Sequence, residues 1–165
     1  MATKRRWLRK LKHAKCLARP KEKRPTKGKR AIIDGHRYEE QVARYLKALY
    51  GAEFVLHGQW IEYEDPRGTA RCQPDIILLP DPPRRKLITV FESKLTWTQA
   101  AAEEKLKGIY RPVVAYIWPE YPIKLIQVCK KLKTKTRERT KVVSTSVKVL
   151  LEEIALYSVW HWRPK

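Results

Sequence analysis

Two short apolar runs joined by a proline-rich turn constrain the fold of this chain more than any other feature. Residues 76–79 read IILL, the turn reads PDPP, and residues 87–91 read LITVF. Continuous apolar runs of this length are typical of strands buried on both faces of a sheet. The short connection lets the two strands lie side by side, so they predict the centre of a β-sheet.

The rest of the pattern alternates between helix and strand periodicities. Apolar residues at helical spacing predict a helix over residues 38–50, which Gly51 would end. Residues 53–63 and the turn at Pro66 and Gly68 predict a hairpin. Residues 112–118 and 123–129 read as further strands, and residues 98–110 and 144–157 read as helices. This order predicts an α/β domain over residues 31–165, with a mixed central β-sheet flanked by helices.

Positive charge is concentrated at the N-terminus. The formal net charge is +20, and fourteen of the 37 Lys and Arg residues lie in residues 1–30, against Glu22 alone. Apolar residues recur at helical spacing among the basic residues of positions 4–17. We interpret residues 1–30 as a partly disordered, nucleic-acid-binding tail that includes a helix formed on a partner. A solvated tail, a localisation signal and a membrane-surface helix are the alternatives.

A second basic cluster occupies residues 130–141, where seven Lys or Arg residues accompany one acidic residue between two apolar segments. We interpret it as a loop that adds another rim to a DNA-binding face. The predicted nucleic-acid contacts are Lys4, Arg5, Arg6, Arg9, Lys10, Lys130, Lys131 and Lys133.

Several classes of protein are disfavoured by what the sequence lacks. It contains no run of 18 apolar residues and no signal-peptide pattern, so we expect a cytoplasmic protein without a membrane partner. The three cysteines stand far apart without a C-x-x-C pair, which disfavours disulfides and zinc ribbons. The four histidines have no paired ligand spacing, and we expect them to be surface or core residues. A phosphate-binding P-loop is also absent.

Charged residues stand at the ends of the two apolar runs. Asp75 precedes the first, and Glu92 and Lys94, which share a strand face, end the second. Two carboxylates beside an ammonium group predict a Mg²⁺ site, since Mg²⁺ prefers oxygen ligands together with substrate phosphate. Lys94 would hold the attacking water or neutralise charge on a phosphoryl group. The alternative is a solvated Glu-x-Lys pair with Asp75 capping a turn.

Pro74-Asp75, followed after sixteen residues by Glu92-Ser93-Lys94, resembles the signature of the PD-(D/E)XK nuclease superfamily. That superfamily also places a glutamate on the preceding helix, where Glu39 and Glu40 stand. Glu39 shares a helix face with Val42 and Leu46, which points it inward. Either glutamate is alternatively an ordinary acid in a first helical turn.

The order of residues 35–130 is most similar to the archaeal-type Holliday-junction resolvases. The resemblance implies a restriction-endonuclease-like core, with Asp75, Glu92, Lys94 and Glu39 as catalytic residues and the three carboxylates as metal ligands. It implies a Mg²⁺-dependent DNA endonuclease, active also with Mn²⁺, that acts on branched or double-stranded DNA. Symmetric nicking of a junction would favour a homodimer.

Two features depart from those resolvases, namely a longer segment between Glu39 and Asp75 and the basic tail. The compact chain suits a phage, a virus or a mobile element. The alternative function is a non-catalytic nucleic-acid-binding protein, such as a packaging or RNA-associated factor, which would act identically in the presence of EDTA.

Overall fold

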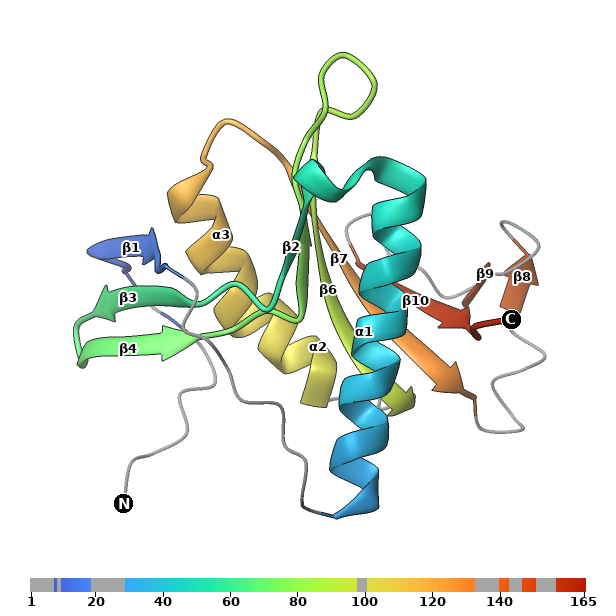
Figure 1. Cartoon of the computed structure of the whole chain (residues 1–165). Coiled ribbons are helices and arrows are strands. Elements are labelled where there is room, and N and C mark those ends of the chain that lie inside the picture. Colours follow the sequence, from blue (N-terminus) through green and yellow to red (C-terminus); the bar gives the residue numbers. More distant parts are fainter. Residues whose placement is uncertain are drawn as a thin grey trace.

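A central β-sheet carries helices on both faces, and a smaller sheet lies beside it (Figure 1). The computed structural model describes residues 8, 10–18, 29–97, 101–132, 140–142, 147–150 and 157–165. The predicted α/β class with a mixed sheet is confirmed. Within the described part of the chain, no helix is long and apolar enough to cross a membrane.

The large sheet has seven strands in the order β2-β5-β6-β7-β10-β9-β8. β6 is parallel to β7 and β7 is parallel to β10, whereas the other neighbours are antiparallel. The predicted pair of apolar strands is confirmed as β5 and β6, inside this sheet. The strands are β2 (Val55–His57), β5 (Ile76–Leu78), β6 (Ile88–Thr96), β7 (Ile123–Lys131), β8 (Thr140–Val142), β9 (Val147–Leu150) and β10 (Tyr157–Trp162).

Helix α1 (Arg30–Tyr50) covers one face of the large sheet and leads through a short 3-10 turn, η1 (Ala52–Phe54), into β2. Its buried residues Tyr38, Val42, Ala43 and Leu46 recur at helical spacing. They pack against strand residues that include Ile76, Phe91 and Ile126. The helix starts earlier than predicted: its first two turns contain no buried residue, so the pattern of core-facing residues begins only at Tyr38.

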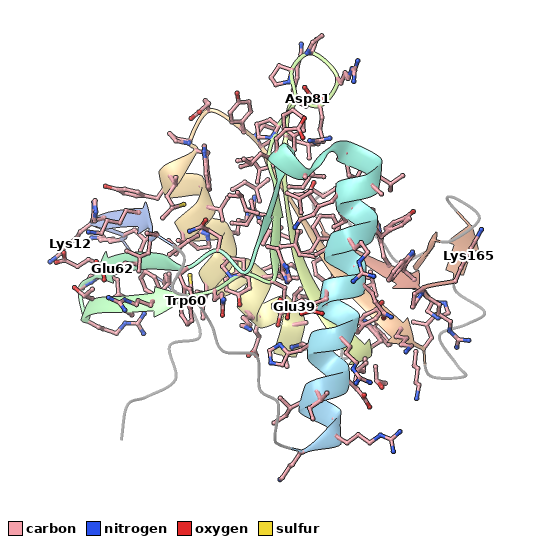
Figure 2. All side chains as sticks on the ribbon, viewed as in Figure 1. Lys12, Glu39, Trp60, Glu62, Asp81 and Lys165 are labelled. Carbon is pink, nitrogen blue, oxygen red and sulfur yellow. The ribbon has the colours of Figure 1, made fainter. Side chains whose placement is uncertain are left out.

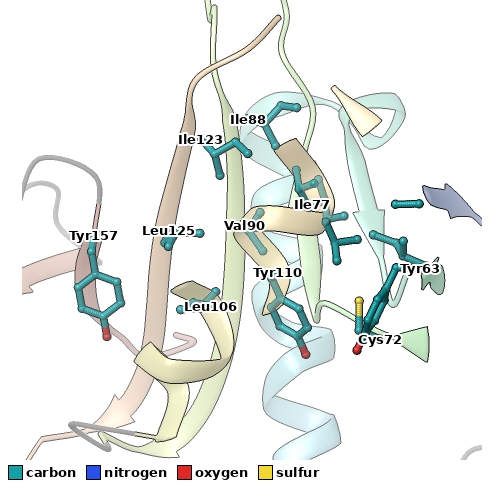
Figure 3. Packing of buried hydrophobic residues seen from close by; sticks show 14 of the residues in the cluster. Tyr63, Cys72, Ile77, Ile88, Val90, Leu106, Tyr110, Ile123, Leu125 and Tyr157 are labelled. Atoms are coloured by element: carbon teal, nitrogen blue, oxygen red, sulfur yellow. The ribbon is translucent and has the colours of Figure 1, made fainter. Parts of the chain in front are cut away.

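The opposite face is covered by α2 (Ala101–Lys105), a π-helical turn η2 (Leu106–Tyr110) and α3 (Arg111–Ile117). Ile88 and Val90 of β6 pack here with Leu106 and Tyr110 (Figure 3), whereas Phe91 belongs to the core under α1. This alternation follows from the two-residue period of a strand. Residues 98–100 of the predicted helix lie outside the described part.

The prediction of a strand over residues 112–118 is wrong, because this segment forms α3. A short apolar run cannot be assigned to a strand or a buried helix by periodicity alone. Pro112 lies in the first turn of α3, directly after the π-helical turn η2. Val113 and Val114 are buried, whereas Tyr116 is exposed, as expected for a helix with one face on the sheet.

The predicted helix over residues 144–157 is also wrong within the described residues. Val147–Leu150 forms β9 and Tyr157 begins β10, while residues 143–146 and 151–156 lie outside the described part. β10 pairs in parallel with β7, so that Tyr157 lies opposite Leu125. Backbone pairing with a distant strand determined the secondary structure of this segment. The spacing of apolar residues within the segment does not indicate such pairing.

The small sheet is antiparallel and has the order β1-β3-β4. Its strands are β1 (His13–Cys16), β3 (Ile61–Asp65) and β4 (Gly68–Cys72), and β3 and β4 include the turn that the sequence predicted. The helix expected within residues 4–17 is wrong at residues 13–16, which pair with β3. Part of the segment expected to be a tail therefore belongs to the folded structure.

Candidate functional site

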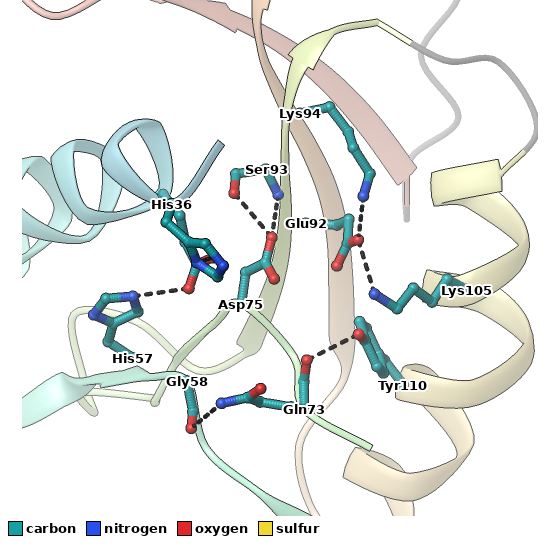
Figure 4. Close-up of polar contacts among 11 residues, drawn as sticks. His36, His57, Gly58, Gln73, Asp75, Glu92, Ser93, Lys94, Lys105 and Tyr110 are labelled. Carbon is teal, nitrogen blue, oxygen red and sulfur yellow. Dashed lines mark hydrogen bonds and ion pairs between the residues drawn. The ribbon is translucent and has the colours of Figure 1, made fainter. Parts of the chain in front are cut away.

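The register of the β5–β6 hairpin brings the two predicted carboxylates together. Ile76 pairs with Phe91 and Ile77 with Val90 in the antiparallel ladder. Continuing this register by one residue sets Asp75 opposite Glu92, and Figure 4 shows both carboxyl groups at this end of the hairpin. The hairpin turn, which contains Asp81, lies at the opposite end of the two strands. Glu39 of α1 lies far from this turn (Figure 2).

Asp75 is held by the strand that it faces. Its Oδ2 accepts hydrogen bonds from the backbone N–H and the hydroxyl of Ser93, at 2.7 and 2.9 Å. Burial raises the pKa of Asp75 from its ordinary value of 3.8 to about 7, and repulsion from Glu92 and Glu39 adds to this effect. The two Ser93 hydrogen bonds oppose the rise. Asp75 therefore changes its protonation state near neutral pH.

Glu92 is the most buried charged side chain of the site, with only 1% of its surface exposed. Its Oε1 accepts hydrogen bonds from Lys94 Nζ at 2.8 Å and Lys105 Nζ at 3.0 Å. Its Oε2 is buried and has no hydrogen-bond partner among the described residues. A buried carboxylate oxygen without a partner is costly, so Oε2 is an open acceptor position for a donor or a cation.

Lys94 lies on the same strand face as Glu92, as the alternation of side chains along a strand predicts, and its ammonium contacts Glu92 Oε1. Burial lowers the pKa of Lys94, but attraction from Glu92, Asp75 and Glu39 outweighs it and leaves the pKa above its ordinary value. Lys94 therefore stays an ammonium at neutral pH. It can donate hydrogen bonds and neutralise negative charge, but it cannot act as a base.

Glu39 lies on the other side of Asp75, on α1. It is 19% exposed and contacts His57 Nε2 at 2.9 Å and His36 Nδ1 at 3.8 Å. Its charge acts on Asp75 and Lys94. Among the described residues, no three His, Cys, Asp or Glu side chains are arranged to hold a metal ion between them. Asp75 and Glu92 are neighbours (Figure 4), and Glu39 lies close enough for its charge to act on Asp75.

Sequence reasoning missed three contributors to this site, namely His57, Ser93 and Lys105. His57 was expected to be a surface or core residue, yet β2 pairs with β5 and sets His57 opposite Ile76, beside Asp75. The contact of Ser93 could have been predicted from the antiparallel register, because Ser93 directly follows Glu92, which lies opposite Asp75. Nothing in the local sequence indicated His57 or Lys105, which reach the site from other elements.

Two aromatic side chains of this region pack in the core. The Tyr110 hydroxyl donates a hydrogen bond to the Gln73 carbonyl at 2.9 Å, so Tyr110 anchors the segment that leads to Asp75. Trp97 packs on the core, and its buried indole N–H has no partner among the described residues.

Three of the predicted nucleic-acid contacts lie within the described residues. Lys10 and Lys131 are exposed and Lys130 is partly exposed. Lys131 pairs with Thr96 at the ends of the parallel strands β7 and β6, two residues beyond Lys94, so it lies at the same sheet edge as the site. The remaining predicted contacts lie outside the described part; they are Lys4, Arg5, Arg6, Arg9 and Lys133.

Comparison of the chain with protein-family models, with curated proteins and with solved structures found no match.

Proposed function

We propose that this protein is a metal-dependent DNA endonuclease that hydrolyses phosphodiester bonds. The observation that carries the proposal is the open acceptor at the end of the hairpin. Glu92 Oε2 is buried without a hydrogen-bond partner, the Asp75 carboxyl group faces the same region, and Lys94 adds an ammonium group. Two convergent carboxylates beside a charged lysine suit a hard cation and a phosphate better than they suit a structural ion pair.

The donor set fits Mg²⁺, with Mn²⁺ as a substitute, because these ions are commonly held by one or two carboxylates together with substrate phosphate. Asp75 and Glu92 would hold the ion, and Glu39 would support the site through its charge. When bound, the ion would polarise the phosphodiester and make a coordinated water more acidic. Lys94 would donate hydrogen bonds to the attacking water or to a phosphoryl oxygen.

The charge distribution favours DNA as the substrate. Lys131 stands at the same sheet edge as Lys94, and the basic N-terminal segment carries fourteen of the 37 Lys and Arg residues. Such clusters neutralise phosphates along a nucleic acid without reading its sequence. We further propose a restriction-endonuclease-like core, cytoplasmic action, and a preference for branched DNA that a homodimer would nick symmetrically.

The test is a cleavage assay on labelled four-way junction, flap, duplex and single-stranded DNA with Mg²⁺ or Mn²⁺. Asp75→Asn and Glu92→Gln remove a charge with little change in shape, and we expect either one to abolish cleavage. The matched control is Glu103→Gln, which removes a carboxylate of α2 that pairs with Lys107 instead of with the site.

Symmetric junction nicks would identify a resolvase, and cleavage of another substrate would keep the nuclease and discard the junction. If well-folded protein cleaves none of the substrates but binds them equally in EDTA, the proposal is refuted in favour of a non-catalytic nucleic-acid-binding protein.

A further inference from the structure

Two lysines contact the buried carboxylate of Glu92. The ammonium of Lys94 already lies 2.8 Å from Glu92 Oε1, yet Lys105 places a second ammonium 3.0 Å from the same oxygen. Both lysines leave Oε2 without a partner. One cation is enough to neutralise the charge of Glu92, so Lys105 adds a second positive charge to a site that also holds Asp75 and Glu39.

Lys105 is held in place by its surroundings. Its Nζ lies 5.2 Å from the centroid of the Tyr110 ring, within the range of a cation–π contact. The Tyr110 hydroxyl in turn bonds the Gln73 carbonyl, two residues before Asp75 (Figure 4). Ala102, Leu106 and Tyr110 are buried and fix α2 and η2 on the sheet. Lys105 is therefore presented by a helical segment that contacts β6 at Glu92 and the residues before β5 at Gln73.

The side chain of Lys105 nevertheless remains open to a ligand, since 43% of its surface is exposed, compared with 1% for Glu92. A buried structural cation would be covered, whereas this ammonium reaches both the buried carboxylate and solvent. An incoming anion can therefore approach Lys105 without displacing Glu92 from the protein interior.

The charges of the site indicate which anion this would be. Asp75, Glu92 and Glu39 contribute three negative charges when all are ionised, and Lys94 and Lys105 contribute two positive charges. A divalent cation bound as proposed above would leave an excess of one positive charge, which matches the single charge of a phosphodiester. Without Lys105 the total would be zero, so this residue supplies the excess.

We propose that Lys105 is a substrate-contact residue that binds a backbone phosphate of DNA at the site. The inference rests on the proposed nuclease function and adds a second lysine, from α2, to the one on β6. The competing role is positioning, in which Lys105 only orients Glu92 toward the cation.

Three substitutions separate charge from orientation. Lys105→Gln removes the charge but retains an N–H donor for Glu92, and Lys105→Arg retains the charge. The matched control is Lys107→Gln on the same segment, because Lys107 also pairs with a carboxylate, that of Glu103, and lies 5.0 Å from a tyrosine ring centroid, that of Tyr157. Thermal unfolding followed by circular dichroism verifies that each variant is folded.

DNA binding is measured by fluorescence anisotropy with Ca²⁺ in place of Mg²⁺, from 50 to 300 mM salt, on whichever DNA the wild type cleaves. Losing one phosphate contact should weaken binding about eightfold near 0.1 M salt and reduce the salt slope by about 0.9. We expect this result for Lys105→Gln, and wild-type behaviour for Lys105→Arg and Lys107→Gln. Calorimetric titration with Mn²⁺ should show that Lys105→Gln binds the ion at least as tightly as the wild type.

Three outcomes would overturn the inference. They are an unchanged salt slope for Lys105→Gln, an equal loss for Lys107→Gln, or a tenfold weaker Mn²⁺ affinity that would make Lys105 a positioning residue. Wild-type cleavage in Mg²⁺ is measured first. Its absence would refute the proposed function itself, whereas normal wild-type cleavage with any of the three outcomes would refute the role of Lys105 alone.

Discussion

Replacing Asp75 by asparagine should stabilise the metal-free protein at alkaline pH, although it removes a residue of the proposed site. Burial and the charges of Glu92 and Glu39 raise the pKa of Asp75 from 3.8 to about 7 in the folded protein. Between these two values the folded state binds more protons than the unfolded state, so stability falls as the pH rises and levels off above about 7. The ionised carboxylate therefore destabilises the folded protein, and a neutral amide at this position removes the destabilisation.

The size of the effect follows from the shift. About three pKa units correspond to at most about 4 kcal/mol, since each unit is worth about 1.4 kcal/mol. The asparagine oxygen can still accept both Ser93 hydrogen bonds, and its amide can donate to a neighbouring carboxylate. We therefore expect Asp75→Asn to raise the free energy of unfolding by about 2–4 kcal/mol at pH 8 and by much less at pH 4.

Urea unfolding in EDTA at pH 4, 6 and 8 measures this difference. The control is Asp34→Asn, which removes a surface pair with Arg30 and should change stability by less than about 1 kcal/mol at each pH. A variant less stable than the wild type at pH 8, or a difference that does not grow from pH 4 to pH 8, would refute the reasoning. Asp75 would then be stabilised in its ionised form by contacts that outweigh its burial.

Three further predictions concern the parts that support the site. Tyr110→Phe removes the hydrogen bond to the Gln73 carbonyl and should lower the free energy of unfolding by about 1 kcal/mol, and unchanged urea unfolding would show that this bond contributes nothing. Phe91→Ala opens a cavity beneath α1 and should cost about 3–5 kcal/mol, so a loss below 1 kcal/mol would contradict its burial. Replacing Lys4, Arg5 and Arg6 by glutamine should weaken DNA binding and lower the salt slope by about 2–3, whereas an unchanged slope would exclude the N-terminal segment from binding.

The sequence alone determined the hairpin and the positions of its charged residues. The apolar runs after Asp75 and before Glu92 needed to be buried on both faces, and a short connection left them few partners other than each other. Because side chains alternate along a strand, Glu92 and Lys94 had to share a face, and the register then set Asp75 opposite Glu92. All of these relations arise between residues close together in the chain, where local patterns carry the information.

The tertiary structure alone decided what surrounds the hairpin. His57 reaches Glu39 because β2 joins the edge of the large sheet. Lys105 reaches Glu92 because α2 packs on the face of this sheet opposite to α1. Residues 112–117 became helical and Tyr157–Trp162 a strand because of the distant elements that they pack against. Burial and backbone pairing between segments far apart in sequence override weak local propensities, and no local periodicity records which distant segment will be the partner.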